Sequence, residues 1–235
     1  MNCRQCNLPV DVANDLAMAM PALAPIVCGK CGDERAQREH WMTMAHAIRS
    51  IPPKYQSAHW GSDALYERCP DLRDLEEPKP ALLLSDPILL LHGPTGAGKT
   101  SLAVALLQWI VESTTHRSDS ALIQRARMAR FVNARDVPPV RGAEGHNFAR
   151  IARAASVLLL DDVGQEAGTG ETFQGDERCA AVAAVLEHAY QTEQQIIVTT
   201  YGSPKSWADA YGAGIARRFW ENPDAKKIKL ERRAM

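Results

Sequence analysis

Residues 93–100, GPTGAGKT, combine glycines, a lysine and a hydroxyl group at the spacing that holds the phosphates of a nucleotide. They fit the pattern G-x-x-x-x-G-K-[ST], whose glycines let backbone N–H groups wrap the phosphates. The lysine neutralises charge on the terminal phosphates, and the threonine hydroxyl ligates Mg²⁺. A glycine-rich turn with a solvated lysine could match the same pattern. The apolar run before the loop and the helical pattern from Lys99 favour a nucleotide site instead. The predicted binding residues are Gly93, Pro94, Thr95, Gly96, Ala97, Gly98, Lys99, Thr100 and Ser101.

Two adjacent acids, Asp161 and Asp162, end a second apolar run. Ligands of open α/β sheets gather at the carboxyl ends of the strands, where these acids are expected. Asp161 is suited to hold Mg²⁺ through water, and Asp162 to orient or deprotonate an attacking water. Alone, such a pair could be a solvated turn, but beside the phosphate loop it predicts hydrolysis of ATP or GTP.

The elements that must position these residues are short apolar runs separated by helical patterns. Runs typical of buried strands cover 88–91, 129–134, 156–162 and 195–200. Helical patterns are carried by Leu102, Ala103, Leu106, Leu107 and Ile110, and by Cys179, Val182, Ala183, Leu186 and Tyr190. Strands without polar alternation that alternate with helices predict an α/β fold with a parallel sheet covered on both faces.

Composition sets the broad class. The chain has 235 residues, 46% of them hydrophobic, and a net charge of −1, so it can bury a core and offers a polyanion no general attraction. No apolar run reaches membrane-spanning length, and the start MNCRQCNLPV lacks the pattern of a signal peptide. We expect a soluble cytoplasmic protein without a membrane partner.

Two CxxC pairs lie near the start of the chain, Cys3 with Cys6 and Cys28 with Cys31. Their separation of 21 residues is at the edge of the pattern for a structural Cys₄ zinc site. A segment of this size cannot support a core of its own, so a metal would stabilise it. The alternative is four unrelated reduced cysteines. We predict one Zn²⁺ per chain, held by these four thiolates.

Three stretches follow along the chain. Residues 1–32 hold the zinc ligands, residues 33–80 form a helix and an extended linker, and residues 81–235 form the nucleotide-binding domain. The linker helix is indicated by apolar residues at i, i+3, i+4 and i+7 spacing and is stopped by Pro52 and Pro53. Cys69 and Cys179 are expected to be packing residues.

GPTGAGKT, LLLDDVGQE, the strand IIVTT and GIARRFWE occur in that order. Together they resemble the AAA+ ATPases of the replicative helicase loader family (DnaC/DnaI-like), with the IstB-like transposition helpers as relatives. RSIPPKYQSAHW, residues 49–60, resembles the linker that precedes the ATPase core in these loaders. The resemblance covers roughly residues 45–222, and some family members also carry an N-terminal zinc module. It implies a P-loop AAA+ core, and the 17 residues after the arginine pair are too few for a full lid domain.

The resemblance implies roles for individual residues. Lys99 and Thr100 match the Walker A ligands, and Asp161 matches the Walker B ligand of Mg²⁺. Arg218 matches the arginine finger that reaches the ATP of a neighbouring subunit, which implies ATP-dependent assembly. Without the resemblance, Arg217 and Arg218 are equally a basic helix end that complements the helix dipole.

Two positions depart from the family pattern. Asp162 stands where many members have glutamate, a longer acid, and Glu166 could supplement it. The strand that usually ends in a polar residue such as Asn here offers Thr200, followed by Tyr201. We therefore expect slow hydrolysis, typical of a switch rather than a motor.

A local excess of arginine lies between residues 115 and 153, with eight arginines against three acids. The arginines are Arg117, Arg125, Arg127, Arg130, Arg135, Arg141, Arg150 and Arg153. They could track the phosphates of single-stranded DNA, or they could be solvated charge and ion pairs.

The expected function is that of an ATP-dependent loader, which binds a hexameric replicative helicase and places it on single-stranded DNA. The alternative is an IstB-like ATPase that assists transposition on double-stranded DNA. A third class, a P-loop kinase of a small molecule, would need a substrate lid for which the short tail leaves little room.

Overall fold

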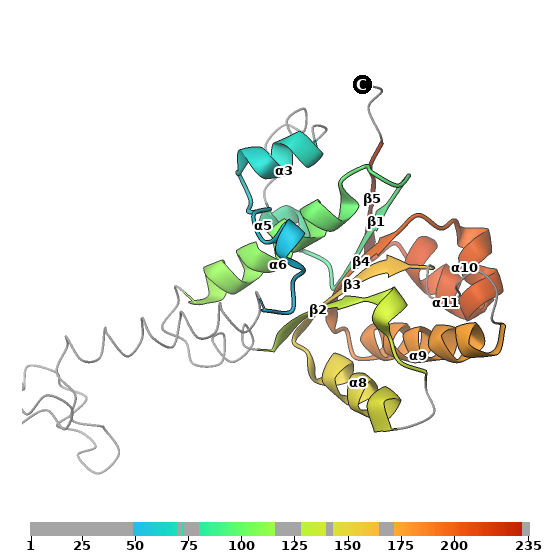
Figure 1. Ribbon diagram of the computed structural model, residues 1–235. Helices are drawn as coiled ribbons and strands as arrows, with labels where there is room; N and C mark the ends of the chain where they lie inside the picture. Colours follow the sequence, from blue (N-terminus) through green and yellow to red (C-terminus); the bar gives the residue numbers. More distant parts are fainter. Residues whose placement is uncertain are drawn as a thin grey trace, which may run out of the picture. The chain divides into compact units, whose positions relative to one another are not determined.

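The computed structural model describes residues 49–69, 72, 80–115, 128–139, 143–164 and 172–231 of the chain (Figure 1). All of them belong to one compact unit, Met44–Met235. The four cysteines of the predicted zinc site, Cys3, Cys6, Cys28 and Cys31, lie outside the described residues.

The described unit is built on a parallel sheet of five strands in the order β2-β3-β4-β1-β5. The strands are β1 (Ile88–His92), β2 (Ala129–Asn133), β3 (Val157–Val163), β4 (Gln195–Thr200) and β5 (Ala225–Lys229). All four strand pairs run parallel. The α/β class with a parallel sheet is therefore confirmed, and each predicted apolar run is a strand.

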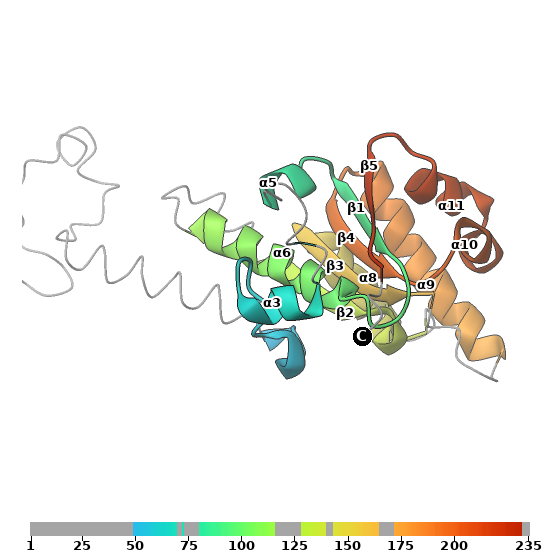
Figure 2. The same ribbon diagram turned by 90° about the horizontal axis from the view of Figure 1, so that it is seen from above.

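Helices cover both faces of this sheet (Figures 1 and 2). On one face, α6 (Lys99–Thr115) packs against alternate strand residues such as Leu89 and Leu91. The opposite face carries α8, α9, α10 and α11, which pack against the intervening residues such as Leu90. Those four helices are Ala143–Ala154, Thr172–Gln191, Pro204–Tyr211 and Ala213–Trp220. Because the three central strands β1, β3 and β4 are buried on both faces, their sequences read as continuous apolar runs.

The segment between residues 49 and 72 packs onto the α6 face as part of the same core. It contains η1 (Pro53–Tyr55) and α3 (Asp63–Arg68), which begins where the Ser62 side chain accepts a hydrogen bond from the Leu65 amide. The side chains that enter the core are Ile51, Ala58, Leu65, Cys69 and Leu72. The short helix α5 (Pro80–Leu83) then leads into β1. Part of the predicted linker is thus integral to the nucleotide-binding unit.

Strand β5 has no counterpart among the apolar runs of the sequence. It reads AKKIK, and only Ala225 of its five residues is buried, because β5 is an edge strand beside β1. Its backbone pairing, from Ala225 opposite Ile88 to Lys229 opposite His92, defines it instead. Edge strands are often rich in lysine, which discourages pairing with other chains. Among the described helices, none is long and apolar enough to cross a membrane.

Candidate nucleotide-binding and catalytic site

The phosphate loop lies between β1 and α6, and two of its glycines are required by close neighbours. At Gly93, with φ +140°, an added Cβ would lie 2.0 Å from the carbonyl oxygen of Leu230. At Gly98, with φ +84°, it would lie 2.1 Å from the Sγ of Cys69. The Cys69 thiol also donates to the Gly98 carbonyl at 3.0 Å. The loop is therefore fixed by the residue that follows β5 on one side and by the residue that follows α3 on the other.

Lys99 begins α6, as the sequence predicted. Its ammonium donates to the carbonyls of Gly93 and Pro94, at 2.9 and 2.8 Å, so it lies within the curve of the loop. Burial lowers the pKa of Lys99 from its usual value, against the opposing attraction of Asp162 and Asp161. A phosphate in the loop would give this ammonium a charged partner in place of the neutral carbonyls.

One helix and two strands supply Asp161 with two hydroxyl donors and one side-chain amide. Thr100 Oγ1 donates to Asp161 Oδ1 at 2.8 Å, and Thr199 Oγ1 donates to the same oxygen at 2.6 Å. Asn133 Nδ2 lies 3.5 Å from the other carboxylate oxygen. Burial raises the pKa of Asp161, and the hydrogen bonds from Thr199 and Thr100 oppose that rise. Hard oxygen donors of this kind are what Mg²⁺ prefers, so Thr100 and Asp161 fit the predicted ion.

Asp162 adopts a left-handed backbone conformation, with φ +59°, at an irregularity in the pairing of β3 with β4. Its amide donates to Thr199 Oγ1 at 2.9 Å, and its side chain lines the cavity beside Lys99. One hydroxyl thus receives a bond from Asp162 and gives one to Asp161. The arrangement holds the two acids side by side with different surroundings, one buried and one facing the cavity.

The sequence points to Thr200 as the polar end of this strand, but Thr199 is the residue that contacts the two acids. Thr200 faces the opposite side of the sheet, where its hydroxyl donates to the Val163 carbonyl at 2.7 Å and accepts from Trp207 Nε1 at 3.1 Å. The alternation of side chains along β4 indicates Thr199, because Thr199 lies on the same face of the sheet as Ile197, which packs against α6.

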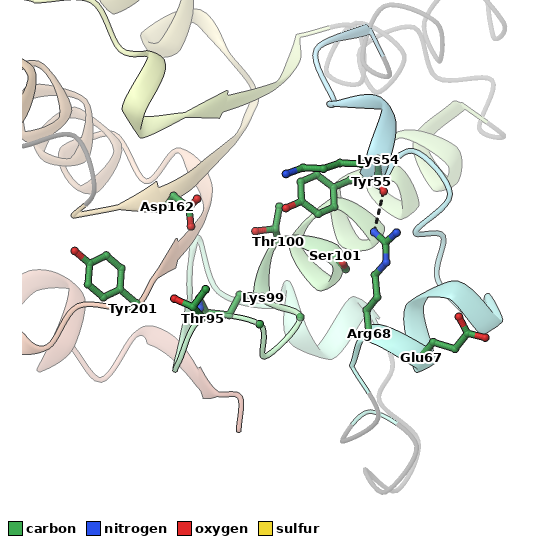
Figure 3. Close-up of a pocket in the computed structure, with 12 residues that line it drawn as sticks. Lys54, Tyr55, Glu67, Arg68, Thr95, Lys99, Thr100, Ser101, Asp162 and Tyr201 are labelled. Carbon is green, nitrogen blue, oxygen red and sulfur yellow. Dashed lines mark hydrogen bonds between the residues drawn. The ribbon is translucent and has the colours of Figure 1, made fainter. Parts of the chain in front are cut away.

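A cavity of about 460 Å³ opens over the loop, within the range of small-molecule sites. Its lining comes from four parts of the chain: the 49–69 segment, the phosphate loop with α6, β3, and the residue after β4 (Figure 3). The lining residues are Lys54, Tyr55, Glu67, Arg68, Thr95, Gly96, Gly98, Lys99, Thr100, Ser101, Asp162 and Tyr201. Tyr201, half exposed, donates its hydroxyl to the Gly164 carbonyl at 3.1 Å. The sequence does not identify the first four lining residues, Lys54, Tyr55, Glu67 and Arg68, as part of the site, since no nucleotide-binding motif includes them.

Arg218 lies on α11, apart from the residues that line the cavity of its own chain. Its guanidinium pairs with the carboxylate of Glu187 and lies 5.0 Å from the ring centre of Tyr190. Both partners belong to α9. The neighbouring Arg217 is exposed. The predicted role of Arg218 in the site of another subunit stays a prediction.

The basic stretch is described only in part. Arg117, Arg125, Arg127 and Arg141 lie outside the described residues, as does Glu166. Arg135, Arg150 and Arg153 are exposed, and the Arg130 side chain bonds the carbonyl of Ala129 at 2.7 Å.

Comparisons with known proteins give the family and the fold. Residues 89–209, more than half of the chain, match the family described as "ATPase family associated with various cellular activities (AAA)". No curated protein matches the sequence significantly. A solved DNA replication initiation factor is similar with a TM-score of 0.50 and 18% identity, over 77% of this chain and 50% of that one. A solved DnaC helicase loader has a TM-score of 0.46 and 16% identity, over 76% of this chain and 99% of that one.

The initiation factor is thus about twice as long as the part that this chain matches, and at this identity the likeness concerns the fold. The family match agrees with the geometry of the loop and of the acid pair, whose residues lie within the matched range. The chain belongs to the AAA family, and it is an ATPase with a P-loop AAA+ core.

Proposed function

We propose that the chain is a DNA replication protein that binds a hexameric replicative helicase and loads it onto single-stranded DNA, using slow, switch-like ATP hydrolysis. The observation that carries the proposal is the packing of the 49–69 segment against the phosphate loop, through Cys69 and Gly98. This segment carries the loader-like sequence RSIPPKYQSAHW, and its contact gives nucleotide binding a route to the N-terminal part of the chain.

The chemistry follows from the site. Backbone N–H groups of the loop and the Lys99 ammonium bind the phosphates and hold the terminal phosphorus for in-line attack. Asp162 orients a water molecule and accepts its proton as the water oxygen bonds to phosphorus and the bond to ADP breaks. Thr100 and Asp161 would hold Mg²⁺, which would supply positive charge beside the phosphate oxygens. A carboxylate shorter than glutamate reaches the water less well, which supports slow turnover.

Assembly is part of the proposal. Arg218 lies outside its own cavity, which supports a role at the ATP of a neighbouring copy. Such an arginine stabilises charge on the transferring phosphoryl group and raises the rate by about 10³–10⁵. ATP would then favour the oligomer, because it is bound between two copies.

The N-terminal cysteines are proposed to hold one Zn²⁺ in a module that contacts the helicase. The basis is the spacing of Cys3, Cys6, Cys28 and Cys31. Metal analysis of protein expressed with ample zinc should give about one equivalent per chain. The quadruple replacement by serine should abolish it, while less than half an equivalent in the unaltered chain would contradict the module.

The test of the function is light-scattering chromatography of the full chain with the replicative helicase of its host, with and without ATP. We expect a stable complex that is lost when residues 1–48 are removed, and an ATPase that the removal leaves active. No complex in either condition, together with binding to double-stranded but not single-stranded DNA, would favour the transposition helper instead.

A further inference from the structure

The cavity contains a second ammonium group besides that of Lys99. Lys54 belongs to η1, is exposed, and lines the cavity together with Thr100 and Asp162. In Figure 3 its Nζ points toward the open space that separates Asp162 from Thr100. That space is where the loop and the acid pair would place the terminal phosphate of a bound nucleotide.

The Lys54 side chain contacts an aromatic ring, and its backbone is tied to α3. Its Nζ lies 4.7 Å from the centre of the Tyr55 ring, and the guanidinium of Arg68 lies 5.8 Å from the same centre. Arg68 Nη1 also donates to the Lys54 carbonyl at 2.8 Å (Figure 3). An aromatic face holds an ammonium by cation–π attraction and leaves its N–H groups available.

The backbone of η1 is anchored to the phosphate-binding helix. Gln108, buried on α6, donates to the Gln56 carbonyl at 3.3 Å. Within the described ranges, no carboxylate lies within ion-pair distance of Lys54. The ammonium therefore faces the cavity and is not neutralised by any carboxylate of the described residues.

The charge of the cavity favours a further cation. ATP brings more negative charge than Lys99 and one Mg²⁺ together neutralise, and Asp161 and Asp162 add to it. The other two charged lining residues, Glu67 and Arg68, offset each other. A further ammonium at the acid end of the cavity would offset that excess where the third phosphate lies. ADP lacks this phosphate, so the same ammonium would have much less to bind.

We propose that Lys54 binds the γ-phosphate of ATP within its own chain, so that the 49–69 segment distinguishes ATP from ADP. The proposal rests on the ATPase activity alone and requires neither a helicase nor a second subunit. Hydrolysis would remove the phosphate that Lys54 binds, so η1 would lose this contact with the nucleotide. The segment that follows the N-terminal part of the chain would thus report which nucleotide is bound.

The test is calorimetric titration of the full chain with Mg²⁺ and either AMPPCP or ADP at fixed salt. Replacing Lys54 by alanine should weaken AMPPCP binding about tenfold, equivalent to about 1.4 kcal/mol, and ADP binding by no more than about twofold. Lys54→Arg should retain most of the AMPPCP affinity. Lys205→Ala, an exposed lysine on α10 that does not line the cavity, is the matched control and should change neither affinity.

Hydrogen exchange supplies a second readout. AMPPCP should slow exchange of the amides of residues 55–58 more than ADP does, and Lys54→Ala should remove the difference. An unchanged AMPPCP affinity in Lys54→Ala, or an equal loss for AMPPCP and ADP, would overturn the proposal. Failure of the unaltered chain to bind either nucleotide would contradict the ATPase conclusion instead.

Discussion

Thr199 and Asp161, 38 positions apart in the sequence, are joined by a hydrogen bond of 2.6 Å from the threonine hydroxyl to the carboxylate. The same hydroxyl accepts the amide of Asp162 at 2.9 Å. Both strands are buried and adjacent in the sheet, so this bridge cannot shift without moving the acid pair. Thr199, which follows the apolar core of β4, therefore sets the geometry of the end of β3 that carries Asp161 and Asp162.

Replacing Thr199 by valine should reduce ATP turnover at least about tenfold and lower the free energy of unfolding by about 1–3 kcal/mol, because a buried amide and carboxylate lose a partner. Thr200→Val is the matched control. It removes an equally buried hydroxyl on the other face and should cost similar stability while leaving turnover nearly unchanged. Steady-state ATPase rates and chemical denaturation of both variants measure this. Equal loss of turnover in the two would mean that the effect comes from general destabilisation.

Asp161→Asn should stabilise the chain without nucleotide at neutral pH while abolishing Mg²⁺-dependent hydrolysis. Burial raises the pKa of Asp161, so ionising this group costs stability in the folded state. Below pH 3.8, the pKa of this carboxyl group in the unfolded chain, the wild-type chain bears no such cost. The cost grows as pH rises through the folded pKa of Asp161 and is constant above it. The gain in stability of Asp161→Asn over the wild-type chain should therefore be largest at neutral pH and shrink as pH falls toward 3.8. Thermal melts from pH 4 to pH 8 test this, and an advantage that grows on acidification would contradict it.

The phosphate loop and the acid pair could be predicted from the sequence because each is a contiguous motif beside an apolar strand. Lys99 begins α6 and Asp161 ends the core of β3, as expected. Thr199 could have been found from strand alternation, yet only the pairing of β4 with β3 shows which acid it meets.

Other parts of the site depend on tertiary packing that local patterns do not carry. β5 is defined by pairing with β1 and reads as a charged segment. Lys54 and Arg68 reach the cavity because the 49–69 segment folds back on α6, through contacts between residues far apart in the sequence. The Cys69–Gly98 contact likewise joins a cysteine outside any motif to a motif glycine.

Gly98→Ala should destabilise the chain and weaken nucleotide binding far more than Gly61→Ala. Both glycines have a φ near +80°, so alanine costs about 1–2 kcal/mol of backbone strain at either position. Only at Gly98 does the added Cβ also meet Cys69 Sγ and the Arg68 carbonyl oxygen, while nothing lies within 4 Å at Gly61. Denaturation and ADP titration of the two variants separate the clash from the strain. Adding Cys69→Ala to Gly98→Ala should restore little, because the carbonyl 2.3 Å away belongs to the backbone; a full rescue would assign the whole effect to the thiol.

Arg218→Ala should reduce turnover about 10³-fold or more if this arginine acts on the ATP of a neighbouring copy, whereas the exposed Arg217→Ala should have little effect. Neither change touches the loop, so nucleotide affinity of the free chain should be retained.

The decisive measurement mixes Arg218→Ala with Lys99→Ala, each inactive alone. The first keeps an intact phosphate site and the second keeps the arginine, so a mixed oligomer contains sites completed by Arg218 from its neighbour. Activity should therefore rise on mixing and depend on total protein concentration. Because Arg218 pairs with Glu187 in the free chain, Glu187→Gln should release the guanidinium and shift the half-maximal concentration downward. A mixture that remains inactive, with each variant shown by light scattering to assemble, would place the role of Arg218 within its own chain, in holding α11 against α9.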